Sequence, residues 1–364
     1  MAQRTGVDPG ATSALVREAF PGVHALLDPP TLERLLGRRV SSVRREPFET
    51  SGWSSTEATF ERVVVDGPGA PRLVIKIIDR ARDWLAISSE DDVDREVRVW
   101  ETGLLEWLPQ PMDHAVIACS RDEAGYAVLM HDVSDFLFER EATVRMADQP
   151  IVLETLATLH AACWMDASLR HPTLGLCTLE QVTSCLAPSV PARLRPIVGS
   201  IDLLDAADEG WATMRSLVET DFVARLTAIA EEPGPLAAAA ARYPWTLVRG
   251  DVRPPNVGID REIDRVILLD WAIPACGPPA LDLAWWLFSS YTLVETGPEP
   301  IIEIYRDALE RRLGQPVEDG WWEPSFGLSV VSLLCTLGPF IATYQSGMLP
   351  WWVEQAKRGL ALLR

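Results

Sequence analysis

Positive charge is in short supply along this chain. Its 364 residues include 33 lysines and arginines against 52 aspartates and glutamates, a formal net charge of -19. A nucleic-acid binder needs a basic stripe that displaces counterions from phosphates, so this composition argues against DNA and RNA as partners. The acids are scattered over many segments, and we interpret them as a solvated surface rather than a signal for a cationic ligand.

Paired cysteine motifs and an apolar leader are also missing. None of the six cysteines has a CxxC spacing, which is typical of buried thiols in a reducing compartment. The opening stretch, MAQRTGVDPGATSALV, lacks the long apolar core of a secretory signal. We therefore expect a cytoplasmic protein.

Histidine is scarce, and long uncharged runs are rare. All five histidines precede residue 172, so a histidine-based hydrolase or zinc site would have to draw on a scattered few. One run, residues 326–344, has no charge and is flanked by tryptophan pairs, as a membrane span can be. Its serines, its Gly338-Pro339 break and the lack of a basic cluster at either end favour a buried core helix and no membrane contact.

The length predicts two lobes, because it exceeds the usual size of one hydrophobic core. Residues 14–38 have helical periodicity, and three strands follow in RRVSSVRREPF, EATFERVVVD and RLVIKIID. A helix in DDVDREVRVWETGLLEWL precedes two more strands in HAVIACSRDEAGYAVLMHDV. Helices dominate afterwards, so we expect an N-terminal lobe over residues 1–132 and a helical C-terminal lobe over residues 133–364.

The scarcest residue types stand where chemistry is expected. Asparagine occurs once, as Asn256, within LVRGDVRPPNVGIDREIDRVILLDW, residues 247–271, which also contains Asp251 and Asp270. Aspartate and asparagine favour turns, so a D-x4-N spacing alone means little, but this chain makes its other turns without asparagine. Only Lys76 and Lys357 are lysines, and Lys76 lies in the third predicted strand. A lysine there supplies a compact point charge that arginine does not replace.

Several stretches resemble the aminoglycoside phosphotransferase and choline kinase family of small-molecule kinases. They are RGDVRPPN, ILLDW and GPPALDLAWW, with TLATLHAACW upstream, and the resemblance extends from about residue 40 to 290. It implies an α+β, protein-kinase-like bilobal fold. The small N-terminal lobe would hold a five-stranded antiparallel sheet and one helix, and the larger, mainly helical C-terminal lobe would hold the catalytic loop, residues 247–271.

The resemblance also implies residue roles, which agree with the needs of phosphoryl transfer. That reaction needs a positioned hydroxyl, Mg²⁺ on the phosphates, and a cation on the phosphates that stay behind. Asp251 would orient the acceptor hydroxyl and take its proton. Asn256 and Asp270 would bind Mg²⁺ through oxygen. Lys76 would hold the α- and β-phosphates of ATP, with Glu96 on the next helix as its ion-pair partner.

Further contacts follow from the same resemblance. Arg253 would reach the transferring phosphate, or it is a solvated loop residue. A solvated role is also open for Glu96, because Glu101 shares its predicted helix. The phosphate loop would use Ser54 and Ser55 in ETSGWSST, which has a single glycine. Adenine would pair with the backbone of a hinge formed by Met130, His131, Asp132 and Val133.

Two positions depart from the family pattern. Arg249 stands where most relatives carry a histidine that supports the loop backbone, and Trp271 follows Asp270 with no glycine two places on. These departures leave open a catalytically weak or inactive nucleotide-binding module. His160, in LATLHAACW, is interpreted as a histidine that ties the lobes together, and Asp282 as a buttress of the catalytic loop.

The acceptor is the least determined part of the prediction. Its site should lie between the insert of about residues 170–245 and the C-terminal helices. Family members act on aminoglycosides, choline, sugars and related alcohols, and the 14 tryptophans, concentrated late in the chain, could stack such molecules or only pack the core. A protein kinase is less expected, because only WAIPACGPPAL separates Asp270 from Asp282. The sequence does not address the oligomeric state.

Overall fold

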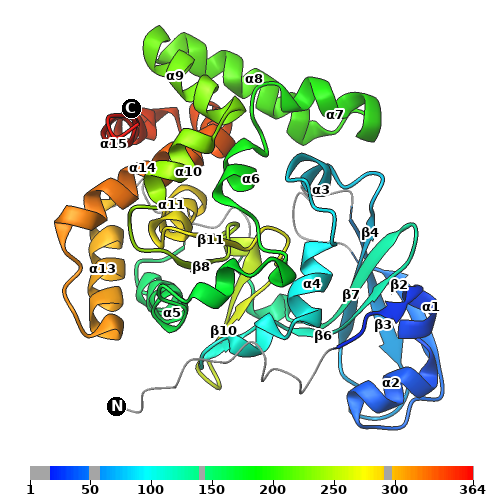
Figure 1. Cartoon of the computed structure of the whole chain (residues 1–364). Helices are drawn as coiled ribbons and strands as arrows, with labels where there is room; N and C mark the ends of the chain where they lie inside the picture. The colour runs from blue at the N-terminus through cyan, green and yellow to red at the C-terminus, as the bar shows by residue number, and fades with distance from the viewer. Residues whose placement is uncertain (1–16, 49–57, 139–143, 291–296, 364) are drawn as a thin grey trace.

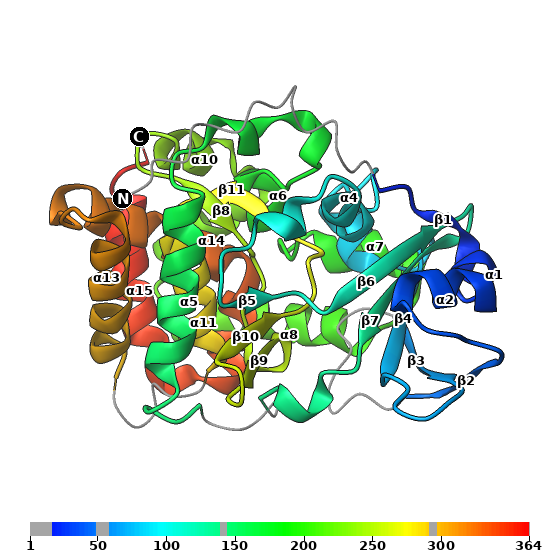
Figure 2. The ribbon, with the colours of Figure 1, turned by 90° about the horizontal axis from the view of Figure 1, so that it is seen from below.

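A sheet-bearing half lies beside a larger helical half in the computed structural model of this chain (Figures 1 and 2). The structure describes residues 17–48, 58–138, 144–290 and 297–363. The main sheet has six strands in the order β1-β6-β7-β4-β3-β2. Their bounds are β1 (Phe20–Pro21), β2 (Val43–Pro47), β3 (Thr59–Val65), β4 (Leu73–Asp79), β6 (Val116–Arg121) and β7 (Gly125–His131).

The five predicted strands form the antiparallel part of this sheet. Every neighbouring pair among β2, β3, β4, β6 and β7 is antiparallel, which confirms that expectation. The sixth strand, β1, was not predicted, and it pairs with β6 in parallel through Phe20 and Ser120. A strand of two residues has no side-chain alternation for the sequence to display, so only its tertiary partner defines it.

The helix expected over residues 91–108 is divided into α4 (Arg95–Glu101) and a 3₁₀ turn at Leu104–Trp107. Between β4 and α4 lies α3 (Trp84–Ser88), which was not predicted. The carboxylate of Asp83 caps α3 by accepting hydrogen bonds from the N–H groups of Leu85 and Ala86. Short helices α1 (Gly22–Leu26) and α2 (Pro29–Leu36) lie between β1 and β2, within the stretch of residues 14–38 for which the sequence predicted helix.

The helical half contains ten further labelled helices among the described residues and two small sheets. The helices are α5 (Gln149–Ala162), α6 (Leu179–Ser184), α7 (Val190–Val198), α8 (Asp202–Leu217), α9 (Thr220–Glu231), α10 (Gly234–Ala240), α11 (Ala280–Ser289), α13 (Glu299–Leu313), α14 (Asp319–Tyr344) and α15 (Leu349–Leu360), of which α10 is a short one of two turns. The sheets are β5-β10-β9 and β11-β8, formed by β5 (Met112–Asp113), β8 (Thr246–Val248), β9 (Val257–Asp260), β10 (Arg265–Leu268) and β11 (Ala275–Gly277).

The uncharged run 326–344 lies within α14, the central helix of this half. By length and composition α14 could cross a membrane, but 94% of its most apolar window is buried inside the protein. It packs against α8, α11 and α15 (Figure 1). The approach to α15 is close, because a Cβ added to Gly359 would lie 2.3 Å from the carbonyl oxygen of Gly327. The expected core helix is therefore what the structure shows.

The six cysteines are all free thiols, and five of them are buried, as expected. Most of the late tryptophans pack on one another rather than on a cavity. Trp321, Trp322 and Trp351 form a chain of ring contacts with Phe326, and Trp352 stacks edge-on against Trp351. The structure therefore supports core packing, rather than ligand stacking, as the role of these residues.

Candidate active site

The predicted catalytic loop begins with a backbone turn that only glycine accommodates. Strand β8 ends at Val248, and Gly250 has a φ of +83°. A Cβ on Gly250 would lie 2.3 Å from the carbonyl oxygen of Ile273. The buried carboxylate of Asp282, on α11, accepts hydrogen bonds of 2.8 Å from the N–H groups of Arg249 and Gly250. Asp282 thus makes the buttressing contacts that the sequence predicted.

Replacing Gly250 by alanine should destabilise the fold more than a left-handed conformation alone explains. The positive φ costs about 1–2 kcal/mol for any residue with a Cβ, and the contact with Ile273 adds to it. Gly314→Ala is the matched control, because Gly314 also has a positive φ, of +68°, and nothing lies within 4 Å of its added Cβ. Urea unfolding of both variants should show the larger loss for Gly250→Ala, and equal losses would contradict the close contact.

Asp251 follows this turn and is held by two neighbours on the same loop. Its Oδ2 accepts hydrogen bonds from Arg253 Nε at 3.0 Å and from Asn256 Nδ2 at 2.9 Å. The Asn256 amide also donates to the Asp251 carbonyl oxygen at 3.3 Å. The structure therefore brings Asp251, Arg253 and Asn256 together and fixes the direction of the carboxylate.

A second group joins the sheet half to the end of β10. The ammonium group of Lys76, on β4, lies 2.8 Å from Glu96 Oε2 and 3.0 Å from Asp270 Oδ1. Lys76 and Glu96 are buried, whereas the Asp270 side chain keeps 25% of its surface exposed. The Tyr126 hydroxyl donates to Glu96 at 3.5 Å. The predicted Lys76–Glu96 ion pair is present, and Glu101 instead contacts Arg121.

Burial and ion pairing oppose each other in this group. Burial acts to lower the pKa of Lys76, but the carboxylates of Asp270 and Glu96 raise it above its ordinary value. Burial likewise raises the pKa of Glu96. For Asp270, burial acts to raise the pKa, and the cations Lys76, Arg253 and Arg249 outweigh it and hold the pKa below its usual range. Asp270 is therefore ionised and Lys76 charged at neutral pH.

The two predicted metal ligands lie at one end of the β9–β10 ladder. Val257 pairs with Leu268, and the next step of the ladder is a hydrogen bond of 2.9 Å from the Leu269 N–H to the Asn256 carbonyl. Asp270 follows directly, with a φ of +63°. Because Asn256 uses its Nδ2 on Asp251, its Oδ1 is the atom suited to a cation.

This donor set fits Mg²⁺, which takes one or two protein oxygens and completes its shell with water and phosphate. Among the described residues, no cluster of three or more His, Cys, Asp or Glu side chains could hold a metal by itself. Asn256 and Asp270 would therefore hold the ion only together with the nucleotide phosphates. Their role as metal ligands stays a prediction.

The remaining predicted nucleotide contacts are placed in part. In the hinge, the N–H groups of His131 and Asp132 already donate to Ala115 and Arg72 carbonyls at 2.9 Å, so adenine would need other backbone groups there. Met130 is in the β4–β7 ladder, opposite Val74, and the Val133 carbonyl accepts from Phe136. Ser54 and Ser55 lie outside the described residues. The lobe boundary at 132/133 also stays a prediction.

Arg249 takes up a role that the sequence did not reveal. Its side chain is completely buried, and its two terminal nitrogens donate to the carbonyl oxygens of Asp251 and Leu269. One of them also donates to the Asp270 carbonyl at 3.3 Å. Burial lowers the pKa of this guanidinium. Arg249 thus connects the backbone of the catalytic loop to the strand end that carries Asp270.

His160 braces the helical half from within. Its ring contacts Asp282 Oδ2 at 3.1 Å and the Tyr305 hydroxyl at 2.6 Å, and its carbonyl accepts from Thr246. All of these partners lie in the helical half. The interpretation of His160 as a structural residue agrees with these contacts, but the idea that it ties the two lobes together is wrong, because its bonds join α5 to α11, α13 and β8.

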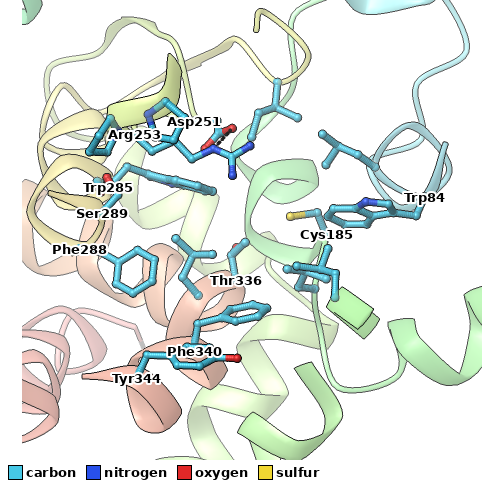
Figure 3. A pocket seen from close by; sticks show the side chains of 17 residues that line it. Trp84, Cys185, Asp251, Arg253, Trp285, Phe288, Ser289, Thr336, Phe340 and Tyr344 are labelled. Carbon is cyan, nitrogen blue, oxygen red and sulfur yellow. Dashed lines mark hydrogen bonds and ion pairs between the residues drawn. The ribbon is translucent and has the colours of Figure 1, made fainter. Parts of the chain in front are cut away.

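A cavity of about 330 Å³ opens beside Asp251 and Arg253 (Figure 3). Its walls come from α11, α14, the insert and, unexpectedly, α3 of the sheet half. Of the late tryptophans only Trp285 lines it, and the other tryptophan in its wall is Trp84. Sequence reasoning missed Trp84, because nothing in the short helix α3 distinguishes it from a core tryptophan.

The comparisons with known proteins agree with this architecture. The ecdysteroid kinase-like family model matches residues 114–315. An aminoglycoside phosphotransferase from Streptomyces rimosus, in complex with ADP and streptomycin, is similar with a TM-score of 0.50 and 17% identity, over 85% of this chain and 98% of that chain. No curated protein matches the chain by sequence.

Two other solved structures are similar at lower TM-scores. An ethanolamine kinase from Plasmodium vivax has a TM-score of 0.49 and 12% identity, over 89% of this chain and 83% of that chain. A choline kinase from Streptococcus pneumoniae has a TM-score of 0.44 and 13% identity, over 92% of this chain and 96% of that chain. The resemblance to small-molecule kinases and the α+β, protein-kinase-like fold are confirmed by the family match and the first of these structures.

Proposed function

This chain belongs to the ecdysteroid kinase-like family, and from that premise we propose that it transfers the γ-phosphate of ATP to a hydroxyl group of a small molecule. The observation that carries the proposal is the position of Lys76, whose ammonium bridges Glu96 at 2.8 Å and Asp270 at 3.0 Å. A buried lysine paired with a glutamate, with an aspartate for the metal beside them, is what phosphoryl transfer in kinases of this fold requires.

The loop residues supply the acceptor side of the reaction. The acceptor oxygen forms a bond to the γ-phosphorus, the bond from that phosphorus to the β–γ bridging oxygen breaks, and ADP leaves. The hydroxyl proton passes to Asp251, which Arg253 and Asn256 hold in place. Bound Mg²⁺, held by Asn256 and Asp270, would neutralise charge on the phosphates. Arg253 would stabilise the negative charge that develops on the transferring group.

Nucleotide binding requires an exchange of partners at Lys76. The Lys76–Asp270 contact uses one carboxylate oxygen, Oδ1, and the partly exposed side chain of Asp270 stays accessible. The buried ion pair with Glu96 keeps the Lys76 side chain extended toward Asp270 when the phosphates bind. The pair therefore keeps the lysine positioned before the nucleotide binds.

Mg²⁺ with ATP should raise the melting temperature of the full chain, because a ligand that binds only the folded state stabilises it by about 2.7 kcal/mol at a hundredfold excess over Kd. Lys76→Met should lose most of this shift. The matched control is Lys357→Met, which removes the other lysine, whose contact is an exposed pair with Glu219 at 3.5 Å. A GTP series run in parallel shows which nucleotide is preferred. If neither nucleotide with Mg²⁺ stabilises the unmodified chain, the kinase proposal is wrong.

A further inference from the structure

The cavity beside Asp251 is apolar on nearly every wall. Two groups of side chains form most of its lining, and Figure 3 shows how they surround the space. The aromatic group is Trp84, Trp285, Phe288, Phe340 and Tyr344. The aliphatic and proline group is Leu85, Leu186, Leu203, Pro254, Pro255, Ile273 and Leu337. Such a surface binds ligands by excluding water from apolar area rather than by pairing charges.

The hydroxyl and thiol groups of Ser289, Thr336 and Cys185 are committed to the protein itself, whereas the buried indole N–H of Trp285 has no hydrogen-bond partner. The Ser289 hydroxyl donates to the carbonyls of Trp285 at 2.8 Å and Val252 at 3.0 Å. The Thr336 hydroxyl donates to Val182 at 2.9 Å, and the Cys185 thiol donates to the same carbonyl at 3.3 Å. These groups hold helices together, so they are not arranged to bind the many hydroxyl and amino groups of a sugar.

Asp251 is the single carboxylate in the lining, as far as the structure describes it. It already has Arg253 as a cationic partner at 3.0 Å. A polycationic acceptor would bring several ammonium groups into this space without a counter-charge for each, and every unpaired buried charge is costly. This lining therefore disfavours the aminoglycosides that other kinases of this fold bind.

A quaternary amine needs a closer argument, because aromatic rings can bind one through cation–π contacts. Here the rings share the surface with at least as many aliphatic and proline side chains, which offer a cation nothing in exchange for its water. The volume of about 330 Å³ also falls in the range of sites for larger organic ligands. A small amino alcohol would leave much of the cavity without contacts.

Resting on the proposed function, we propose that the acceptor is a neutral, largely apolar alcohol whose hydroxyl reaches Asp251 while its hydrocarbon body fills the aromatic cavity. The reaction would convert this alcohol and ATP into a phosphate monoester and ADP, with the alcohol proton transferred to Asp251. The polar end matches the wall that carries Asp251 and Arg253, and the apolar body matches the mainly aromatic and aliphatic remainder of the cavity.

Trp84 makes the sheet half part of this recognition. It lies in α3, directly after β4, the strand of Lys76, and α3 packs on α7 of the helical half. Figure 3 places Trp84 on the opposite side of the cavity from Trp285. The acceptor is thus enclosed between walls from both halves, and Trp84 acts as a specificity residue for the bulk of the apolar body.

The test compares two alcohols of nearly equal shape. Choline carries a quaternary ammonium, and 3,3-dimethyl-1-butanol carries a neutral tert-butyl group in its place. With the full chain, Mg²⁺ and ATP, kcat/KM for the neutral alcohol should exceed that for choline by about tenfold or more, a difference of about 1.4 kcal/mol. A neutral tricyclic alcohol, 1-adamantaneethanol, should be better still, and streptomycin should be the poorest. Higher kcat/KM for choline or streptomycin overturns the inference.

A charge placed in the wall should change this preference. Leu203, a half-buried residue of α8, lines the cavity, so it can be replaced by glutamate with glutamine as the neutral control. Leu203→Glu should raise the ratio of choline to 3,3-dimethyl-1-butanol turnover about tenfold relative to Leu203→Gln. An unchanged ratio would show that the acceptor does not contact this wall, contrary to the inference.

Binding is measured separately from phosphate transfer, so that the two proposals fail differently. Without nucleotide, 1-adamantaneethanol should raise the melting temperature of the full chain more than choline does, and Trp84→Ala should reduce that shift. Stabilisation by the alcohol but not by Mg²⁺ with ATP refutes the kinase proposal alone. Stabilisation by Mg²⁺ with ATP, with neither binding nor turnover of any neutral alcohol, refutes the apolar acceptor alone.

Discussion

Replacing Asp251 by asparagine should remove phosphate transfer and leave nucleotide binding intact. Loss of a proton acceptor of this kind lowers kcat by about 10²- to 10⁴-fold. The fold should tolerate the change, because the asparagine oxygen can still accept from Arg253 Nε and Asn256 Nδ2, which now meet on Asp251 Oδ2. Coupled ADP release with an identified acceptor measures kcat, and thermal shift with Mg²⁺ and ATP measures binding.

The control for this variant lies in the turn between β9 and β10. Asp264→Asn changes an exposed aspartate with a φ of +49°, a conformation that asparagine also adopts, and it should leave kcat unchanged. An inactive nucleotide-binding module makes a different prediction, in which the unmodified chain binds Mg²⁺ with ATP but transfers nothing, so that Asp251→Asn has no effect. Full activity of Asp251→Asn with a confirmed acceptor would exclude Asp251 as the proton acceptor.

The sequence predicted those site residues whose function depends on their chemical type. Lys76 and Asn256 are rare types in this chain, so their positions could be recognised without any structure. The structure places Lys76 at 2.8 Å from Glu96 and 3.0 Å from Asp270, residues 20 and 194 positions away. Sequence motifs identify such a group because each member needs its own chemical type, whatever the intervening chain does.

The part that the sequence did not predict depends on neighbours that are distant in the chain. Trp84 resembles any core tryptophan until α3 is seen beside α7. Strand β1 is only two residues long, and its pairing with β6 alone defines it. The late tryptophans suggested a stacking surface, and Trp321 and Trp322 instead contact each other edge to face. Tertiary contacts of this kind have no local pattern for the sequence to show.

Removal of Arg249 should have the second large effect, on stability as well as rate. Its guanidinium donates to the carbonyls of Asp251, Leu269 and Asp270 from a completely buried position. Arg249→Met leaves those carbonyls without this donor and leaves Asp270 without one of its cations, so we expect a loss of about 3–5 kcal/mol in the free energy of unfolding. Arg242→Met is the control, because Arg242 is exposed and also donates to carbonyls, those of Ala239 and Leu362. Urea unfolding should show only a small change for it.

The pH profile separates the charge of Arg249 from its hydrogen bonds. The cations Lys76, Arg253 and Arg249 hold the pKa of Asp270 below its usual range, so the stability and function of ionised Asp270 are present above its unfolded pKa and are lost as pH falls through the lower folded value. Removing one cation raises that folded pKa. The acid limb of kcat/KM should therefore move to higher pH in Arg249→Met.

Arg249→Lys keeps the positive charge but not the planar fork that reaches two carbonyls at once. This variant should lose nearly as much stability as Arg249→Met. Its kcat/KM should nevertheless keep an acid limb close to that of the unmodified chain. An identical acid limb in all three proteins would show that Arg249 acts through hydrogen bonds alone. In that case its carbonyl contacts, rather than its charge, would account for how Arg249 holds this loop.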